Sequence, residues 1–241
     1  MKNNLQKERS DLAAAFRWAA RLNMHEAVAN HFSLAVSNDG SQFLLNPIGM
    51  HFSEICASDL ILLDSNDPTT MSQPNAPDPT AWAIHGAMHR NNPQARCILH
   101  VHPKYATILA CLDDKTMKPI DQNTMRFYEK ISIDHDYSGM GLGKEAERLS
   151  TILGENSVLL MGNHGVLTAA RTVAQAFDDL YYFEHSCKTL IGAYQTGKKL
   201  RLVSHEIAKK TAQQWQDYDA SDLHFDALKR ILDKEEPDYK T

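Results

Sequence analysis

The sequence predicts an α/β fold built as one domain. Segments with apolar residues at helical spacing alternate along the chain with short β-type runs. No internal repeat and no proline- or glycine-rich linker divides the 241 residues, a length at which a single domain buries a substantial core. We therefore expect one domain over residues 1–241, in which residues from about 200 onward form a charged helical extension whose end frays.

The composition excludes several classes of protein. A hydrophobic content of 43% and a charged content of 23% are typical of a globular protein. The net charge of −5 provides no positive field to attract nucleic acid. No apolar run approaches the roughly 20 residues that span a bilayer, and the N-terminus lacks the apolar core of a signal peptide. We therefore expect a cytoplasmic protein that binds neither nucleic acid nor membrane.

The elements of the first half follow from local patterns. Apolar positions at helical spacing predict a helix over about 6–22. Two β-type runs flank Asn38-Asp39-Gly40, a hairpin signal, and residues 57–64 have the composition of a strand. A polar loop with four prolines follows, and a helix then begins at Pro79 and stops at Asn92 before the next proline.

The second half also alternates strands and helices. Strands are expected at 95–102, 157–162 and 166–170, with further short β segments within 114–140. Helices are expected from Pro103, over about 144–153 and over about 172–197.

Two histidines that are two residues apart end the strand at 95–102. If His100 and His102 lie on a strand, they point to the same face. Two buried imidazoles each need a polar partner, and a single metal ion would serve both. His164 follows another apolar strand and precedes a glycine, so it is well placed to point into a cleft. Three histidines would leave coordination positions open, as a catalytic metal requires.

Two further histidines precede this strand. His85 and His89 are four residues apart and therefore share one face of their helix. For His89 we favour a packed or solvated side chain. The helix immediately precedes the strand that carries His100 and His102, so the side chain of His85 could approach the same place.

These motifs resemble a known family. "HVHP" at 100–103 with Tyr105, and "VLLMGNHGVL" at 158–167, are similar to the two metal-binding motifs of the class II aldolase/adducin family. That family includes fuculose-phosphate and rhamnulose-phosphate aldolases and ribulose-phosphate 4-epimerase. Further segments extend the likeness over roughly residues 5–200: "NHFSLAV", in the NHxS form typical of adducin-like members, "LLNPIGMHFSEICASDLILLD", "DYSGMGLGKEAERL" and "TVAQAFDDLYYFEHSC".

The resemblance implies a fold, a cofactor and an assembly. The fold is a three-layer α/β/α sandwich around a mainly antiparallel sheet. The cofactor is a divalent metal ion held by His100, His102 and His164; zinc is favoured, and iron, manganese or nickel also suit imidazole ligands. The assembly is a homotetramer with active sites at subunit interfaces.

The chain departs from the family at the catalytic acid. The sugar-phosphate aldolases carry an acidic residue at the start of the helix before HxH, where it binds metal and takes the substrate proton. Ala81 occupies that position here, and alanine can do neither. His85 lies one helical turn later and is the candidate to supply the missing base or a fourth ligand.

The phosphate cradle of the family is also reduced. Gly49 and Thr80 match it, whereas His31 replaces its asparagine and Ile48 and Pro79 replace hydroxyl residues. A phosphate dianion needs several N–H and O–H donors. We therefore assign His31, Gly49 and Thr80 to substrate binding and expect a substrate without phosphate.

Two residues complete the candidate site. Tyr137 matches the family tyrosine that protonates the leaving group, and a phenol with a pKa near 10 is suited to donate a proton; a core tyrosine at a turn is the alternative. Glu184 lies in the helix over about 172–197, where we expect it to form a salt bridge on the helix face or at an interface.

Together these features predict a metal-dependent, aldolase-like lyase for a small hydroxy-carbonyl or hydroxy-acid substrate. Two alternatives stay open. A three-histidine site also suits ferrous iron in an oxygenase. A non-catalytic, adducin-like interaction domain would tolerate the loss of the acid, although adducins carry a long basic tail that is not seen in these 241 residues.

Overall fold

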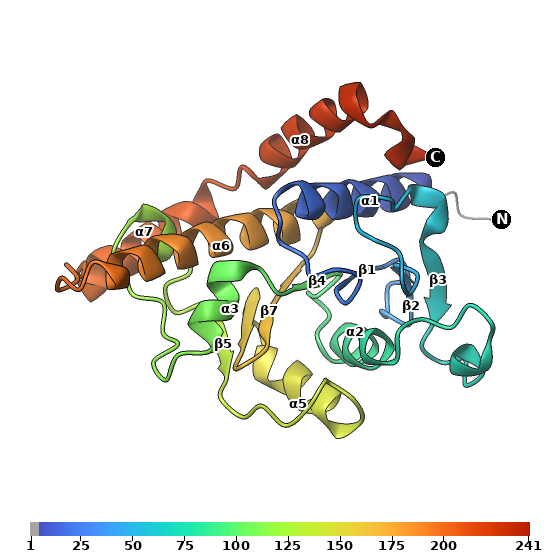
Figure 1. Cartoon of the computed structure of the whole chain (residues 1–241), viewed down its shortest axis with the longest axis horizontal. Coiled ribbons are helices and arrows are strands. Elements are labelled where there is room, and N and C mark those ends of the chain that lie inside the picture. The colour runs from blue at the N-terminus through green and yellow to red at the C-terminus, as the bar shows by residue number, and fades with distance from the viewer. Residues whose placement is uncertain (1–4) are drawn as a thin grey trace.

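A computed structural model of the chain describes residues 5–241 and shows a central seven-stranded sheet between helices (Figure 1). The strands are β1 (His31–Ala35), β2 (Gln42–Leu45), β3 (Ile61–Asp64), β4 (Cys97–Val101), β5 (Ile131–Asp134), β6 (Val158–Met161) and β7 (Gly165–Ala170). The α-helices are α1 (Gln6–Arg21), α2 (Pro79–Asn91), α3 (Lys104–Ala110), α4 (Gln122–Arg126), α5 (Lys144–Leu153), α6 (Val173–Gln195), α7 (His205–Asp217) and α8 (Ser221–Glu235). Short 3-10 turns are η1 (Ala57–Asp59), η2 (Thr70–Ser72) and η3 (Pro237–Lys240).

The three-layer arrangement confirms the predicted fold class. The strand order is β3-β2-β1-β4-β7-β6-β5, and each pairing is antiparallel except that of β5 with β6. Helices α1, α3 and α6 lie on one face of the sheet, and α2 and α5 lie on the other (Figure 1).

Alternation along β4 explains how the sheet positions its polar residues. Leu99 and Val101 join the larger apolar core under α1 and α6, whereas Ile98 joins the core under α2 and α5. His100 has the parity of Ile98 and therefore faces the α2 side. On the neighbouring strand β1, His31 lies directly opposite His100. The sheet thus turns these two histidines toward α2.

The structure corrects the prediction of several short β segments within 114–140. In that range it forms only β5 and, before it, helix α4. The start of α4 carries a capping box, in which the Asp121 carboxylate accepts from the Thr124 N–H and the Thr124 hydroxyl accepts from the Asp121 N–H. This pair is a helix-start signal that outweighs the β-type composition around it. The strand predicted at 57–64 also begins later, because its first three residues form η1.

The end of the chain is ordered, so the prediction that it frays is wrong. Helix α8 and η3 turn back beside α1 (Figure 1). Tyr239 is fully buried, and the Thr241 carbonyl accepts from the Ser58 N–H. The buried Arg17 of α1 donates to the Glu236 carboxylate at 3.0 Å. The charges that suggested a solvated tail instead pair with charges on α1.

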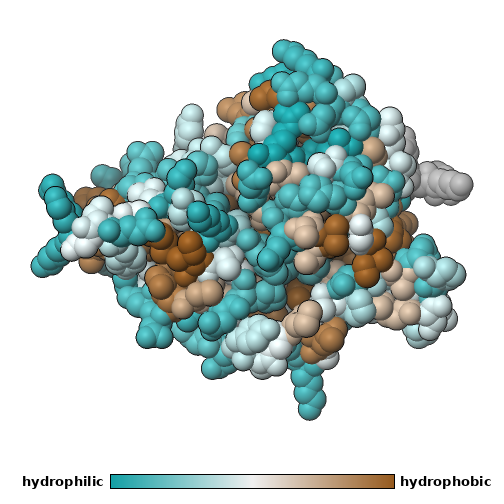
Figure 2. Space-filling view, in the orientation of Figure 1, coloured by the Kyte–Doolittle hydropathy of each residue, from teal (hydrophilic) through white to brown (hydrophobic). Residues whose placement is uncertain are grey.

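The face of the molecule drawn in Figure 2 is mostly hydrophilic, and its hydrophobic residues occur in small separate groups. Within residues 5–241 we find no helix that combines the length and the apolar character needed to cross a membrane.

Candidate metal centre

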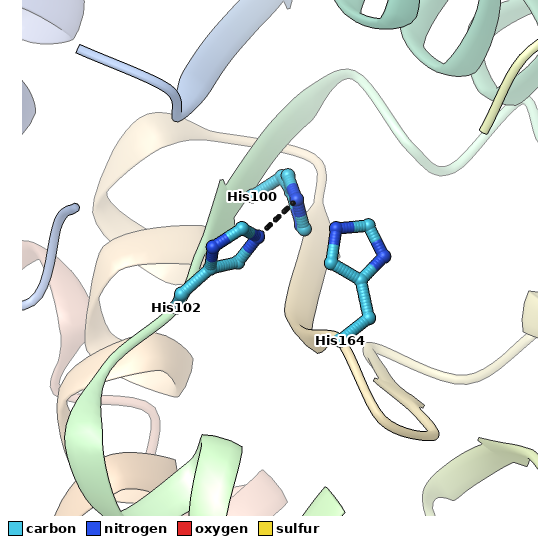
Figure 3. A group of neighbouring side chains, drawn as sticks. All are labelled: His100, His102 and His164. Atoms are coloured by element: carbon cyan, nitrogen blue, oxygen red, sulfur yellow. Dashed lines mark hydrogen bonds between the residues drawn. The ribbon is translucent and has the colours of Figure 1, made fainter. Parts of the chain in front are cut away.

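The fold brings three histidines together at one end of the sheet. His100 lies in β4, His102 follows that strand, and His164 lies in the turn between β6 and β7. Figure 3 shows the three side chains close together. One ring nitrogen from each residue can be chosen so that the three nitrogens lie within 4.8 Å of one another. We call these residues the three-histidine cluster.

The turn between β6 and β7 is shaped for close approach. Asn163 adopts a left-handed backbone with φ of 56°, a conformation that asparagine tolerates better than most residues. A Cβ atom at Gly165 would lie 2.6 Å from Cδ2 of His102 and 2.7 Å from the carbonyl oxygen of Val101. The start of β7 can therefore pass beside His102 only because residue 165 has no side chain.

Hydrogen bonds fix where the protons lie on two of the rings. His100 Nδ1 lies 3.1 Å from the Val166 carbonyl oxygen, and His102 Nδ1 lies 2.7 Å from the Glu26 carboxylate. Both oxygens can only accept, so each ring carries its proton on Nδ1 and a lone pair on Nε2. A carbonyl or carboxylate on the second nitrogen is the usual arrangement around a metal-binding histidine.

The geometry of the two Nε2 atoms fits a shared cation. They lie 3.1 Å apart, along the dashed line in Figure 3, and two lone pairs at that distance repel each other. Nitrogens bound to one tetrahedral zinc ion at about 2.0–2.1 Å are about 3.3 Å apart. The donor set and spacing of the three-histidine cluster therefore suit a divalent metal ion.

Burial keeps His100 and His164 in the form that binds metal. Desolvation lowers the pKa of His100 well below its ordinary value, and neighbouring histidines lower it further. Desolvation also lowers the pKa of His164 to about 4. Both rings are neutral at neutral pH, and neutral imidazole is the ligand state.

Glu184 supports the cluster from behind. Its carboxylate accepts from the backbone N–H groups of Tyr105 and Ala106 at 2.9 and 2.8 Å. These groups belong to the first turn of α3, which begins just after His102. Glu184 of α6 therefore holds the start of α3 in place next to His102. The predicted salt bridge is thus replaced by a helix cap, and no local pattern reveals a partner 79 residues away.

Tyr137 lies near the cluster in the same chain. Its side chain is 51% exposed, and its ring centroid is 6.3 Å from that of His164. The loop that carries it is held by Glu145, which accepts from the Gly141 N–H and the Ser138 hydroxyl. The phenol is accessible from solvent beside His164, and its catalytic role stays a prediction.

His85 lies away from the three-histidine cluster, which changes its predicted role. The side chain is fully buried, with Nε2 at 2.7 Å from Nδ1 of His31 and Nδ1 at 2.5 Å from the Ser33 hydroxyl. Both nitrogens are therefore occupied, and a direct role as base or fourth ligand does not fit this position. His31 lies between His85 and the cluster, with its ring centroid 4.9 Å from that of His100.

The other predicted substrate contacts are dispersed. Gly49 lies in an exposed turn with φ of +78°. The Thr80 hydroxyl donates to the Asp78 carboxylate at 2.5 Å, within the N-terminal cap of α2. Ala81 is buried in an apolar group that includes Phe43. Because the Thr80 hydroxyl is already bonded, the donors available for a phosphate are fewer than the sequence indicates. Sequence reasoning missed the capping role of Asp78.

A separate hollow of about 410 Å³ includes Arg126, Asp179 and Trp215 among its lining residues, and none of the three histidines. Its lining carries both charge signs, and the Arg126 guanidinium already bonds Asp179. This hollow therefore has no evident part in the chemistry of the cluster.

Comparison with known proteins identifies the class of protein that this fold and site define. Residues 10–191 match the family described as "Class II Aldolase and Adducin N-terminal domain". The chain therefore belongs to the class II aldolase/adducin family, which confirms the resemblance drawn from HxH and NHG.

Particular relatives cover nearly the whole chain. A crystal structure of an aldolase II superfamily protein from Pseudomonas syringae has a TM-score of 0.89 at 29% identity, covering 100% of this chain and 98% of that one. L-fuculose 1-phosphate aldolase from Glaciozyma antarctica has a TM-score of 0.82 at 20% identity, covering 98% and 92%, and shows the shared fold.

Two curated relatives carry names that describe other chemistry. Decarboxylase NovR of Streptomyces niveus is 26% identical over 92% of this chain and 84% of its own length. The 4-hydroxy-3-prenylphenylpyruvate oxygenase/4-hydroxy-3-prenylbenzoate synthase of Streptomyces roseochromogenus is 26% identical over 84% and 73%. The family thus includes proteins named for more than one reaction.

Proposed function

We propose that the chain is a metal-dependent lyase that acts on a small, non-phosphorylated hydroxy-carbonyl or hydroxy-acid substrate. The observation that carries the proposal is the convergence of three ring nitrogens. The rings of His100 and His102 are each held by a hydrogen bond at Nδ1, so that the lone pairs on their Nε2 atoms face each other. His100, His102 and His164 would hold a divalent ion, for which zinc is the first choice.

The residues around the cluster would divide the work. When bound, a divalent ion supplies a Lewis acid for neighbouring hydroxyl and carbonyl oxygens. Tyr137, exposed beside His164, would donate a proton from its phenol to the leaving group. The replacement of cradle residues at His31, Ile48 and Pro79 supports a substrate without phosphate, and so does the internal bond of Thr80.

The experiment is elemental analysis of the purified protein under chelator-free conditions. We expect about one equivalent of metal per chain, which is the ratio for a single three-histidine ligand set. The His100→Ala/His102→Ala variant should lose it, whereas His205→Ala/His224→Ala, with two histidines removed from α7 and α8, should keep it. Protein without bound metal would contradict the proposal and favour a non-catalytic interaction domain. Metal that survives in the first variant would contradict the assignment of the ligands.

A second candidate function is a three-histidine iron oxygenase on the same fold. It is favoured by the alanine at position 81, since oxygen chemistry needs no enolising base there, and by the oxygenase relative. Iron in place of zinc, together with turnover that stops under anaerobic conditions, would select this function over the lyase.

We also propose that the enzyme acts as a cytoplasmic homotetramer. The support is the family resemblance and the exposure of apolar side chains beside the site, since Met140 and Leu142 are 69% and 53% exposed. Sedimentation of the purified protein at the mass of a single chain would contradict the tetramer.

A further inference from the structure

A continuous chain of hydrogen bonds runs from His31, whose ring lies against that of His100, into the core beneath α2. His31 Nδ1 contacts His85 Nε2 at 2.7 Å, and His85 Nδ1 contacts the Ser33 hydroxyl at 2.5 Å. The same hydroxyl contacts His89 Nε2 at 2.8 Å, and His89 Nδ1 contacts the Ala95 carbonyl at 2.7 Å. We call His31, His85, Ser33 and His89 the histidine relay.

The end of the relay determines where each proton lies. The Ala95 carbonyl can only accept, so His89 carries its proton on Nδ1 and a lone pair on Nε2. The single Ser33 hydroxyl proton is then donated to His89, which leaves the Ser33 oxygen to accept from His85 Nδ1. His85 Nε2 is therefore an acceptor, and His31 must donate to it from Nδ1. Each assignment forces the next, provided that the three rings are neutral.

Burial supplies that condition. His31, His85 and His89 are 4%, 0% and 3% exposed. Desolvation, the largest cause for both residues, lowers the pKa of His85 well below its ordinary value and lowers the pKa of His89 to about 4. A cation at either position would be needed to reverse the direction of the relay, and the buried site disfavours one.

His31 is the end of the relay that meets the cluster. Its ring lies against that of His100, and Nε2 forms no hydrogen bond within residues 5–241. His31 Nε2 is not fully buried, so part of the 4% of the residue that is exposed lies on this atom. A lone pair on Nε2 is thus presented to whatever occupies the open side of the cluster.

We propose that the relay fixes His31 as a hydrogen-bond acceptor beside the metal centre, so that His31 selects a substrate hydroxyl and disfavours an anionic oxygen. His31 is the contact residue, and His85, Ser33 and His89 are positioning residues that act through it. The selection rests on the function proposed above, because the hydroxyl would be presented by a metal-bound substrate. The proton positions assigned to the relay do not depend on the proposed function.

This assignment gives a physical reason for the expected substrate class. A phosphate or carboxylate oxygen brings only lone pairs to His31 Nε2, whereas a hydroxyl brings a donor. A family asparagine could donate from its amide at this position, but a histidine in this tautomer cannot. The replacement at residue 31 therefore changes the preferred ligand group from an acceptor to a donor.

The first experiment reads the proton positions directly. In protein labelled with ¹⁵N-histidine at pH 7, the ring nitrogen shifts and their proton couplings distinguish the two tautomers, with the His31 signal assigned from His31→Phe. We expect Nδ1–H for His31, His85 and His89, both without metal and with added zinc. An Nε2–H tautomer at His31 would overturn the proposal.

A matched pair of variants tests the relay itself. Ser33→Ala removes the middle link, so the tautomer of His85 is no longer fixed and the population of the Nδ1–H form of His31 should fall below that of the wild type. Ser33→Thr keeps a hydroxyl and should keep the wild-type tautomer. Equal tautomer populations in the two folded variants and the wild type would show that the relay does not set His31. If neither variant folds, the wild-type spectrum alone still decides the tautomer.

The second experiment tests selection with two probes, glycolate and acetate, titrated into the zinc-loaded protein. Glycolate has a hydroxyl that acetate lacks, and one good hydrogen bond corresponds to about tenfold in affinity. We expect the preference for glycolate to fall by about fivefold to tenfold in His31→Phe. An unchanged preference would overturn the selection. Failure to bind zinc would instead contradict the proposed function and leave the measured tautomer intact.

Discussion

The three-histidine cluster and the histidine relay lie side by side, and they satisfy their nitrogens in opposite ways. In the relay, both nitrogens of His85 and of His89 have protein partners, and the series ends at a carbonyl. In the cluster, the second hydrogen bonds of His100 and His102 leave lone pairs that converge. The number of histidines therefore does not by itself indicate a metal centre, whereas convergent acceptors without a donor suit a cation.

The largest effect expected from one substitution is the loss of the cluster in Gly165→Ala. The added Cβ would lie within 2.6–2.7 Å of the His102 ring and of the Val101 carbonyl, and the latter is backbone that cannot move cheaply. We expect a loss of about 3 kcal/mol in the free energy of unfolding, measured by urea titration, and zinc binding reduced toward that of His100→Ala/His102→Ala.

Gly192→Ala is the matched control for this prediction. Gly192 lies in α6, and no atom lies within 4 Å of the Cβ that it would gain. Alanine in an open helix position stabilises by up to about 1 kcal/mol relative to glycine. If both variants bind zinc as the wild type does, the close approach at residue 165 does not shape the cluster.

The next largest effect is the part of the pH dependence of stability that comes from His89 of the relay. Burial lowers the pKa of His89 to about 4, against about 6.5 when the chain is unfolded. Below pH 6.5 the unfolded chain therefore binds more protons than the folded one. The stability from the neutral ring is present above pH 6.5 and is lost as the pH falls toward 4. This loss is about 2 kcal/mol between pH 7 and pH 5.

Urea unfolding of metal-free protein at pH 7, 6 and 5 measures this loss. The His89→Gln variant keeps an amide that can bond the Ser33 hydroxyl but does not titrate, so its stability should fall less steeply by about 2 kcal/mol over the same range. Parallel curves for the wild type and the variant would show that His89 is not held neutral.

A smaller effect is expected where the cluster meets solvent. Glu26 accepts from His102 Nδ1, and its side chain is 66% exposed. Loss of such a partner typically weakens metal binding by 10- to 100-fold, and the exposure of Glu26 places it near the lower limit, at about tenfold for Glu26→Ala. Zinc competition with a chromogenic chelator measures the change. Glu155→Ala, at the opposite end of β6, should bind zinc as the wild type does; equal affinities in all three proteins would remove Glu26 from the site.

The contrast between the two histidine groups also marks what the sequence could predict. The pairing of His100 with His102 follows from strand alternation, and the position of His164 follows from a strand that ends in a turn. Both are local patterns. The relay is not local, because His31 and His85 are 54 residues apart and meet only when α2 packs on β1. Sequence reasoning therefore placed His85 near the site but could not show that His31 and Ser33 occupy both of its nitrogens.

The same limit explains the corrections to the fold. The positions of the main strands along the chain could be predicted, since alternation and turn signals lie in short segments, whereas their order in the sheet could not. The anchored C-terminus depends on Arg17 and Glu236, which are 219 residues apart, so the charged tail looked solvated. Helix α4 was missed for a different reason. Its capping residue Asp121 was visible in the sequence, but the prediction gave more weight to the β-type residues around it.

The smallest predicted effect concerns Glu184, whose contact with α3 is not local in the sequence. In Glu184→Gln the amide oxygen can still accept one of the two bonds from Tyr105 and Ala106, but the negative charge at the start of α3 is lost. We expect a loss of about 1 kcal/mol in the free energy of unfolding, with zinc binding within twofold of the wild type. Glu206→Gln, in the exposed first turn of α7, is the control for loss of a carboxylate near a helix start. Because Glu184 acts through backbone groups behind His102 and not through a ligand nitrogen, a loss of zinc binding without a loss of stability would show that it belongs to the metal centre and not to the helix cap.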